Sequence, residues 1–366
     1  MVLCAACGDT RTDREPAPAP VVDTPAPVAV RDASPDASPD ATAIDATPAR
    51  VEPARWESMT VALTPSPVGG LRVVQRRFLD EYGLALAVRR RFRQDGRTLL
   101  LAVRGDTLES MVFAADKLAA AYRLDESTAD GTSAYERALR ATTAAPFPVH
   151  NDGLIAGRGK GLYLSVDLCP TNRSAQFEKR LFEAAMAMDS QPPVPVAIAV
   201  TGLWMRQHAK HFAWLLERQR AGDLAITWVG HSYRHRTHRD GRALERNFML
   251  APSVDASREI LRTERMLLER GQVPSVFFRF PGLVSSEALL VRLRDQFGLI
   301  AVGTNAWVAK VDRLEPGSIL LIHGNGHEPG GVDRFLQFIG EWRAQGAMPR
   351  LRPLREAALT ALEVPP

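Results

Sequence analysis

Short apolar runs alternate with helical patterns of apolar residues between positions 161 and 322. Runs of this length fit buried strands, and the patterns between them fit helices that cover a sheet. The chain is therefore predicted to be an α/β protein with a parallel sheet or barrel. The expected strands cover 161–166, 195–200, 224–229, 276–279, 300–303 and 318–322, and the expected helices cover 174–188, 207–220, 255–270 and 286–297.

Polar residues stand where these expected strands end. They are Asp167, His231, Arg279, Asn305 and His323. The carboxyl ends of parallel strands meet at one edge of an α/β fold, and active sites of such folds collect at that edge. This agreement between strand register and reactive side chains predicts one site that is built from several strands.

Three of the eight histidines lie within eight residues, at His231, His235 and His238. Two histidines four positions apart on a helical turn face the same side and can bind one metal ion. A basic surface loop is the alternative interpretation, because arginines separate these histidines. The spacing alone leaves both interpretations open.

Asp167, Arg279 and His323 offer complementary chemistry. An aspartate at a strand end is often a helix cap or turn former, so its position alone does not make Asp167 catalytic. His323 precedes the glycine-containing loop 324–326, where an imidazole is well placed for general acid catalysis. Arg279 is suited to pair with a buried carboxylate and to orient it.

Five segments, taken in chain order, resemble the motifs of one known family. They are Ser-Val-Asp-Leu-Cys (165–169), His-Ser-Tyr-Arg-His (231–235), Arg-Phe-Pro-Gly (279–282), Gly-Thr-Asn-Ala-Trp (303–307) and Leu-Leu-Ile-His (320–323). Each segment is short, but all five stand in the family's order at expected strand ends. The region from Gly161 to Ala358 thus resembles the polysaccharide deacetylase (NodB-homology) family, also called carbohydrate esterase family four.

The resemblance implies a distorted (β/α) barrel that removes N-acetyl or O-acetyl groups from a polysaccharide with the help of a divalent metal such as zinc. By position in the motifs, His231 and His235 would hold the metal. Asp167 would be the general base, Arg279 would orient it, and His323 would protonate the leaving group. The motif positions expected to contact the substrate are Pro281, Asn305 and Trp307.

The sequence departs from the family's motifs at three positions. Leu168 replaces the second motif aspartate, a metal ligand in the family; Gly282 replaces a tyrosine; and the fourth-motif aspartate is replaced around Asn305. Loss of an anionic ligand weakens metal binding unless another group compensates. The groups that could compensate are Cys169, His238 and His327, or Asp167 acting as a ligand instead of a base.

These departures leave two main functional hypotheses. The first is a hydrolase that deacetylates a cell-envelope or extracellular polysaccharide by metal-assisted attack of water. The alternative is a catalytically inactive, deacetylase-like protein that binds glycan. A third hypothesis, a metal-independent hydrolase that uses Asp167 and His323 alone, has less support from the motifs.

A smaller folded region precedes the one that carries the motifs. We expect a small α/β domain at 56–145 and the deacetylase-like domain at 155–362. Within the small domain, the patterns predict strands at 60–63, 84–92 and 98–103 and helices at 70–82 and 107–122. Its residues do not group into a recognisable site.

The first residues resemble the end of a bacterial lipoprotein signal, with small residues before Cys7 and a polar tract after it. On this interpretation 1–10 are a remnant of the signal and Cys7 carries the lipid, with Cys4 as the lesser candidate. The segment 11–55 holds nine of the 26 prolines and no aromatic residue, so it is predicted to be a disordered linker. The protein would then lie in the bacterial cell envelope, facing the periplasm or the exterior. The alternative is an ordinary amino terminus with two cysteines and a dispensable tail.

Composition narrows the expected partners. The chain has 46 basic and 42 acidic residues, a net charge of only +4. Its densest basic run, Arg89-Arg90-Arg91, lies among strand-like apolar residues, so nucleic acid is not an expected partner. No stretch reaches the ~18 apolar residues of a membrane-spanning helix, so a membrane is expected only through the lipid anchor. Three cysteines are too few for a disulfide framework. The expected partner is a polysaccharide.

Overall fold

The computed structural model describes residues 59–79, 85–121, 123–125, 133–171, 177–188, 192–237 and 243–362. The predicted signal remnant with Cys7 and the predicted linker 11–55 lie outside the described residues, as does His238.

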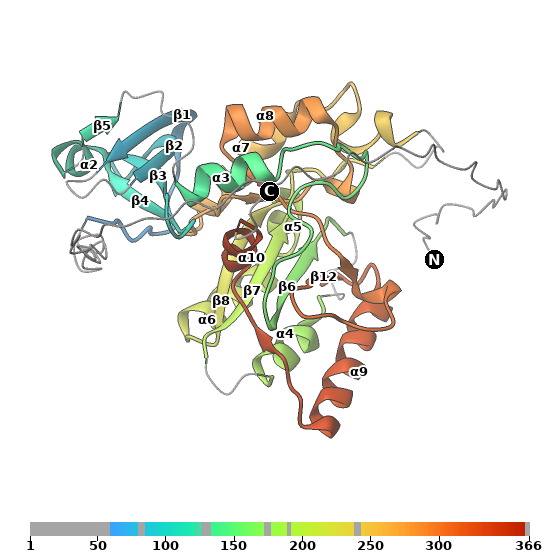
Figure 1. Cartoon of the computed structure of the whole chain (residues 1–366). Coiled ribbons are helices and arrows are strands. Elements are labelled where there is room, and N and C mark those ends of the chain that lie inside the picture. The colour runs from blue at the N-terminus through green and yellow to red at the C-terminus, as the bar shows by residue number, and fades with distance from the viewer. Residues whose placement is uncertain are drawn as a thin grey trace, which may run out of the picture. The chain divides into compact units, whose positions relative to one another are not determined.

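The larger sheet is parallel along its whole hydrogen-bonded path, in the order β10-β9-β8-β7-β6-β12-β11. It curls into a half-barrel with helices around it (Figure 1). This confirms the predicted α/β class. Its strands are β6 (Gly161–Leu168), β7 (Val194–Val200), β8 (Leu224–Gly230), β9 (Phe277–Phe278), β10 (Ile300–Ala301), β11 (Ala306–Trp307) and β12 (Ile319–His323), and β13 (Arg350–Leu351) pairs with the start of β6.

Helices follow the strands as the alternating pattern predicts. Within the described residues, none of them is both long enough and apolar enough to cross a membrane. The helices are α4 (Lys179–Met186), α5 (Gly202–Gln207), α6 (Ala209–Arg220), α7 (Ala256–Leu268), α8 (Glu287–Phe297), α9 (Pro329–Gln345) and α10 (Leu354–Ala361). Short 3₁₀ turns are η1 (Leu244–Arg246), η2 (Phe248–Leu250), η3 (Pro281–Leu283) and η4 (Val308–Lys310).

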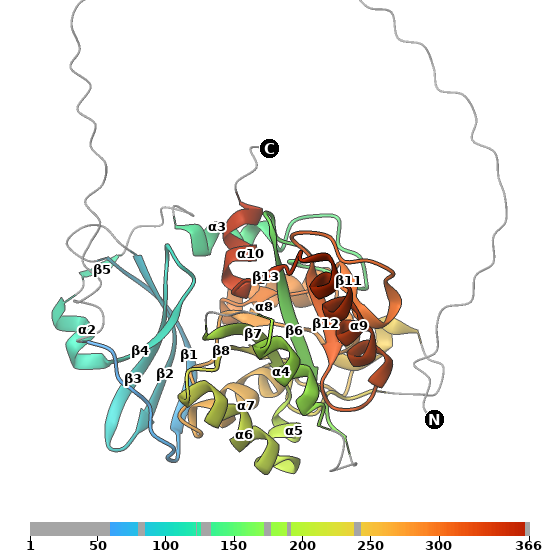
Figure 2. The ribbon, with the colours of Figure 1, turned by 90° about the horizontal axis from the view of Figure 1, so that it is seen from below.

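The two faces of the sheet pack against different helices. Along β6, Leu162, Leu164, Val166 and Leu168 belong to the apolar core that α4, α6 and α9 cover. Tyr163 belongs to a second core on the other face, together with residues of α10. Figures 1 and 2 show α10 on one side of β6 to β8 and α4 and α6 on the other. Because side chains of a strand alternate between faces, this packing decides which residues of β6 turn away from the helical core.

The amino-terminal folded region is a five-stranded antiparallel sheet in the order β4-β3-β2-β1-β5. The predicted helix at 70–82 is wrong, because its described residues, 70–79, form β1. The predicted helix at 107–122 is wrong in its first half, which forms β4. The predicted strand at 60–63 is reduced to an isolated bridge between Thr60 and Phe113. The elements are β1 (Gly69–Leu79), β2 (Ala85–Gln94), β3 (Arg97–Arg104), β4 (Ser110–Ala114), α2 (Ala115–Ala121), β5 (Arg123–Asp125) and α3 (Ala134–Ala141).

Each of the two wrong helix predictions has a physical cause. The register of β1 with β2 shifts twice, between Gly69 and Arg72 and between Val73 and Arg76. Such irregularities break the two-residue alternation of a strand, so the apolar residues of β1 fall at spacings that resemble a helix. In β4, Val112 and Phe113 pack into different cores on opposite faces. A strand that is buried on both faces is a continuous apolar run and cannot be told from a helix by periodicity.

A buried ion pair joins this small sheet to the larger part of the fold. Arg90 of β2 is fully buried and binds Glu264 of α7 through two hydrogen bonds of 2.6 and 2.8 Å. The neighbouring Arg89 donates to the backbone carbonyls of Pro274 and Ser275. Two arginines of the basic run 89–91 are therefore internal and contact protein groups.

Candidate active site

The carboxyl ends of the parallel strands bring the reactive side chains together. Asp167 near the end of β6 pairs in register with His323 at the end of β12. His231 directly follows β8, and Arg279 directly follows β9. Four residues that are far apart in the sequence thus stand at one edge of the half-barrel.

Asp167 and Arg279 form a buried ion pair. The Nη1 of Arg279 donates to Oδ1 of Asp167 at 2.6 Å, and both residues are at least 95% buried. Arg279 is held in turn by the carbonyl oxygens of Gly303, at 3.0 Å, and Val302, at 3.4 Å. Burial would raise the pKa of Asp167, but Arg279, and then His231 and His323, outweigh burial and hold it below its usual value. Asp167 is therefore an anion at neutral pH.

His231 is fixed in one tautomer by the backbone. Its Nδ1 lies 2.8 Å from the carbonyl oxygen of Arg279. A carbonyl can only accept, so Nδ1 carries the proton and the lone pair of Nε2 faces the site. That Nε2 lies 3.8 Å from Oδ2 of Asp167. Burial lowers the pKa of His231 and lowers that of His235 further, so both rings are neutral and suited to metal binding.

A tight loop rather than a helical turn brings the two histidines together, so the helical interpretation of their spacing is wrong. Ser232 and His235 have left-handed backbone conformations, with φ of 62° and 47°. The Oγ of Ser232 accepts from the backbone N–H of His235 at 3.0 Å. Glu259 of α7 accepts from two further backbone N–H groups of the loop, at 2.8 and 2.6 Å. These contacts replace the hydrogen bonds of a helix. The centres of the His231 and His235 rings lie 4.7 Å apart.

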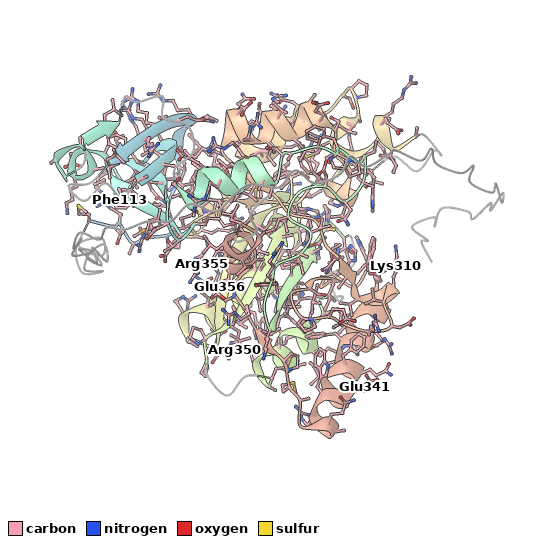
Figure 3. All side chains as sticks on the ribbon, in the orientation of Figure 1. Phe113, Lys310, Glu341, Arg350, Arg355 and Glu356 are labelled. Atoms are coloured by element: carbon pink, nitrogen blue, oxygen red, sulfur yellow. The ribbon has the colours of Figure 1, made fainter. Side chains whose placement is uncertain are left out.

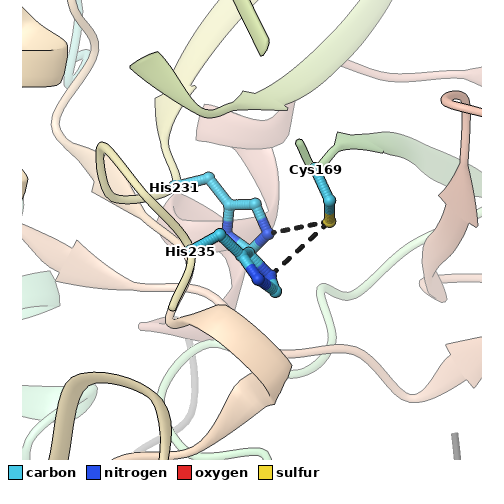
Figure 4. Close-up of side chains that lie close together, drawn as sticks. All are labelled: Cys169, His231 and His235. Carbon is cyan, nitrogen blue, oxygen red and sulfur yellow. Dashed lines mark hydrogen bonds between the residues drawn. The ribbon is translucent and has the colours of Figure 1, made fainter. Parts of the chain in front are cut away.

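Cys169 completes a cluster with the histidines (Figure 4). Its Sγ lies 3.6 Å from Nε2 of His231 and 3.5 Å from Nε2 of His235. The possible ligand atoms of these three side chains all lie within 4.8 Å of one another, close enough to hold one metal ion. Among the described residues, this is the group of histidine, cysteine and acidic side chains with that property. His327, another candidate from the sequence, is not in this group and lies beside Asn325.

The side chain of Leu168 does not face this cluster. Leu168 is completely buried in the helical core on the other face of the sheet. Alternation along the strand puts Asp167 and Cys169 on one side and Leu168 on the other. The two-residue period was visible in the sequence and is the signal that distinguishes Cys169 from Leu168.

His323 belongs to a second cluster at the same edge. Its Nδ1 lies 3.1 Å from Oε2 of Glu328, and the indole N–H of Trp307 donates to the same oxygen at 2.6 Å. Burial would raise the pKa of Glu328, but the hydrogen bonds from His323 and Trp307 hold it below its usual value. Sequence reasoning missed Glu328. The available signal was Glu328-Pro329 itself, because proline at the first helical position marks the start of α9.

Other predicted substrate contacts have structural partners. The side chain of Asn305 accepts from the backbone N–H of Ile319, at the amino end of β12 and so away from His323. Pro281 is buried at the start of η3. Gly282 follows with φ of 63°, and a Cβ there would lie 2.4 Å from the ring of Phe248. A side chain such as the family's tyrosine would therefore displace Phe248.

Trp307, which shares Glu328 with His323, also contacts a lysine. The ammonium group of Lys310 stands 3.4 Å from the centre of its indole ring.

A separate pocket of about 590 Å³ lies at the amino ends of β7 and β8, lined in part by Arg350, Arg355 and Glu356. Figure 3 shows these three residues on one side of β6 and Lys310 on the other. That pocket contains no member of either cluster.

No family model matches the chain. Among solved structures, a family 4 carbohydrate esterase from Bacillus anthracis is 20% identical, with a TM-score of 0.41, over 63% of this chain and 94% of that one. A CE4 family pseudoenzyme from Bacillus anthracis is 15% identical, with a TM-score of 0.40, over 56% of this chain and 68% of that one. The peptidoglycan deacetylase PdaC from Bacillus subtilis is 15% identical, with a TM-score of 0.39, over 56% and 91%. All three of these matches are below 25% identity, with TM-scores below 0.5.

Proposed function

We propose that the protein is a hydrolase that removes N- or O-acetyl groups from a cell-envelope or extracellular polysaccharide. One observation carries the proposal. An ionised, buried Asp167, a cluster of two neutral histidines and His323 all stand at the carboxyl edge of one parallel sheet. This combination supplies a base, a metal site and an acid within one site, which is what hydrolysis of an acetyl group requires.

Asp167 is suited to be the general base. Arg279 occupies one carboxylate oxygen, Oδ1, and fixes the plane of the group. The other oxygen, Oδ2, is on the side of His231 and is available to accept a proton from water. We assign the metal to His231 and His235. A divalent ion bound there would polarise the acetyl carbonyl and acidify the attacking water.

His323 is suited to be the general acid. Glu328 holds its Nδ1, which leaves Nε2 to give a proton to the leaving amine or alcohol. Trp307 is bonded to the same carboxylate and offers an aromatic surface beside it for a sugar ring. We also propose Pro281 and Asn305 as substrate contacts; Pro281 is buried at the start of η3, and the side chain of Asn305 accepts from the backbone N–H of Ile319.

The test is acetate release from acetylated chitooligosaccharides and acetylated xylan, with zinc, cobalt or manganese supplied. We expect release from at least one substrate, and His231→Ala should abolish stoichiometric metal binding with the fold retained by circular dichroism. Unchanged metal content in that variant would remove this site from consideration.

The alternative function is glycan binding without turnover. Its support is Leu168, which replaces an anionic ligand of the family and is buried away from the site. If the protein binds oligosaccharide but releases no acetate with any of the three metals, the alternative is correct.

We also propose the domain and envelope assignments made from the sequence, with a small domain at 56–145, a deacetylase-like domain at 155–362 and a lipid on Cys7. Full-length protein made in a bacterium should partition into detergent, and Cys7→Ser should remain in the aqueous phase. An unmodified amino-terminal peptide in mass spectrometry would contradict lipidation.

A further inference from the structure

Three possible metal-ligating side chains, Cys169, His231 and His235, come from two segments that are distant in the sequence and lie close together in the site. We propose that Cys169 is the third protein ligand of a thiophilic divalent cation, such as zinc, which it binds together with His231 and His235. The inference deepens the proposed function and rests on it only for the use of the metal, because metal binding is measured separately from acetate release.

The distances from the sulfur of Cys169 to the two histidine nitrogens fit such an ion. In a tetrahedral zinc site with Zn–S of ~2.3 Å and Zn–N of ~2.05 Å, sulfur and nitrogen ligands stand about 3.6 Å apart. The observed distances from Sγ of Cys169 are 3.6 Å to His231 and 3.5 Å to His235. Both match the edge of the tetrahedron. A single thiol proton, by contrast, can serve only one of the two nitrogens.

The surrounding backbone holds the donors in place. The carbonyl of Arg279 fixes the ring of His231 so that Nε2 points at the sulfur. The backbone of Cys169 is held by the side chain of Asn325, which is fully buried and donates to its carbonyl oxygen at 2.9 Å. The carbonyl of Asp167, two residues earlier, accepts from the N–H of Gly324 at 3.0 Å. Second contacts of this kind orient metal ligands in known sites.

The ion pair of Asp167 separates the roles of the two candidate anions. Arg279 binds Oδ1 of Asp167 at 2.6 Å and offsets its charge, whereas the sulfur of Cys169 contacts both histidines. Cys169 therefore supplies the anionic ligand, and Asp167 is kept for proton transfer. A thiolate with two imidazoles prefers zinc or cobalt over magnesium, calcium or manganese.

The experiment uses the full chain carrying Cys4→Ser and Cys7→Ser, so that Cys169 is its one thiol. We expect one equivalent of zinc, and cobalt substitution should give the near-ultraviolet charge-transfer band of a thiolate ligand. Adding Cys169→Ser should remove that band and weaken zinc binding by more than ~100-fold, since even changes behind a ligand cost ~10- to 100-fold. Cys169→Asp should recover metal without the band. His211→Asn, which removes an imidazole outside the cluster, should change neither.

A cobalt spectrum and zinc affinity that are unchanged in Cys169→Ser would overturn the inference. If that variant does not fold, alkylation of the parent decides the matter. Zinc should protect Cys169 from iodoacetamide, and equal alkylation with and without zinc would equally overturn it. A protein that binds zinc through Cys169 but releases no acetate would sink the proposed function alone. An active protein with no thiolate band would sink the ligand assignment alone.

Discussion

Two buried arginine–carboxylate pairs in this protein have different geometries. Arg90 and Glu264 share two hydrogen bonds that occupy both carboxylate oxygens, and the pair joins the small sheet to α7. Arg279 and Asp167 share one, and the second oxygen of Asp167 stands 3.8 Å from His231. Both arginines also donate to backbone carbonyls.

The difference separates a structural pair from one that is available for chemistry. A carboxylate with both oxygens bonded to one guanidinium has fewer acceptor sites left for a proton from water. A carboxylate held through one oxygen keeps its orientation and retains an acceptor. We therefore expect changes at Asp167 to affect turnover and changes at Glu264 to affect stability.

The largest effect is expected for Asp167→Asn. The amide still accepts from Arg279 through its oxygen but cannot take a proton from water, so acetate release should fall ~100- to 10,000-fold. The melting temperature should also fall, because Arg279 loses the carboxylate that balances its buried charge. Steady-state rates and thermal unfolding measure the two effects. Near-normal turnover in this variant would mean that the open oxygen of Asp167 has no catalytic role.

The next largest effect is expected for His323→Ala, with a loss of at least ~100-fold. The parent should show a bell-shaped pH profile. Protonation of Asp167 contributes to its acid limb, and Arg279 holds the pKa of Asp167 below its usual value. The alkaline limb reports loss of the acid's proton, so it should vanish in His323→Ala. Its persistence would exclude His323 as the acid.

Glu264→Gln should act on stability alone. The change leaves Arg90 buried without its anion, which typically costs ~3–5 kcal/mol of the free energy of unfolding. Turnover per folded molecule should be unchanged. Denaturant unfolding gives the first quantity and active-site-normalised rates give the second. The matched control is Arg90→Met with Glu264→Leu, which should recover most of the lost stability because no buried charge remains.

The smallest effect is expected for Glu328→Gln, about 10-fold in turnover at neutral pH, a fraction of what loss of the acid itself costs. Glu328 is an anion there, since the hydrogen bonds from His323 and Trp307 hold its pKa below the usual value. A neutral amide accepts these two hydrogen bonds more weakly, so both side chains should be held less firmly, and steady-state rates measure the loss. Unchanged turnover in this variant would show that Glu328 has no part in positioning His323.

Secondary structure was predicted more accurately for the larger sheet than for the small sheet, because the larger sheet has the more regular strand pairing. In the larger sheet each expected strand is found, because regular parallel strands buried between helices give clean apolar runs. In the small sheet the register shifts of β1 hide the strand period. At the site, the convergence of Asp167, His231, Arg279 and His323 could be predicted, because strand ends share an edge. Glu328 was missed: Pro329 marks the start of a helix there, but that signal does not say which side chain the helix start contacts.

The sequence by itself determined the parallel α/β class, the edge at which polar side chains collect and the residue types present there. The sequence named Cys169 as one of several groups that could replace the ligand lost at Leu168, and it left the choice open. Only the tertiary structure decided that Cys169 meets both histidines, that Arg279 occupies one oxygen of Asp167 and that Glu328 holds His323. Those contacts join positions more than 60 residues apart or depend on where a loop ends, and local pattern carries no information about either.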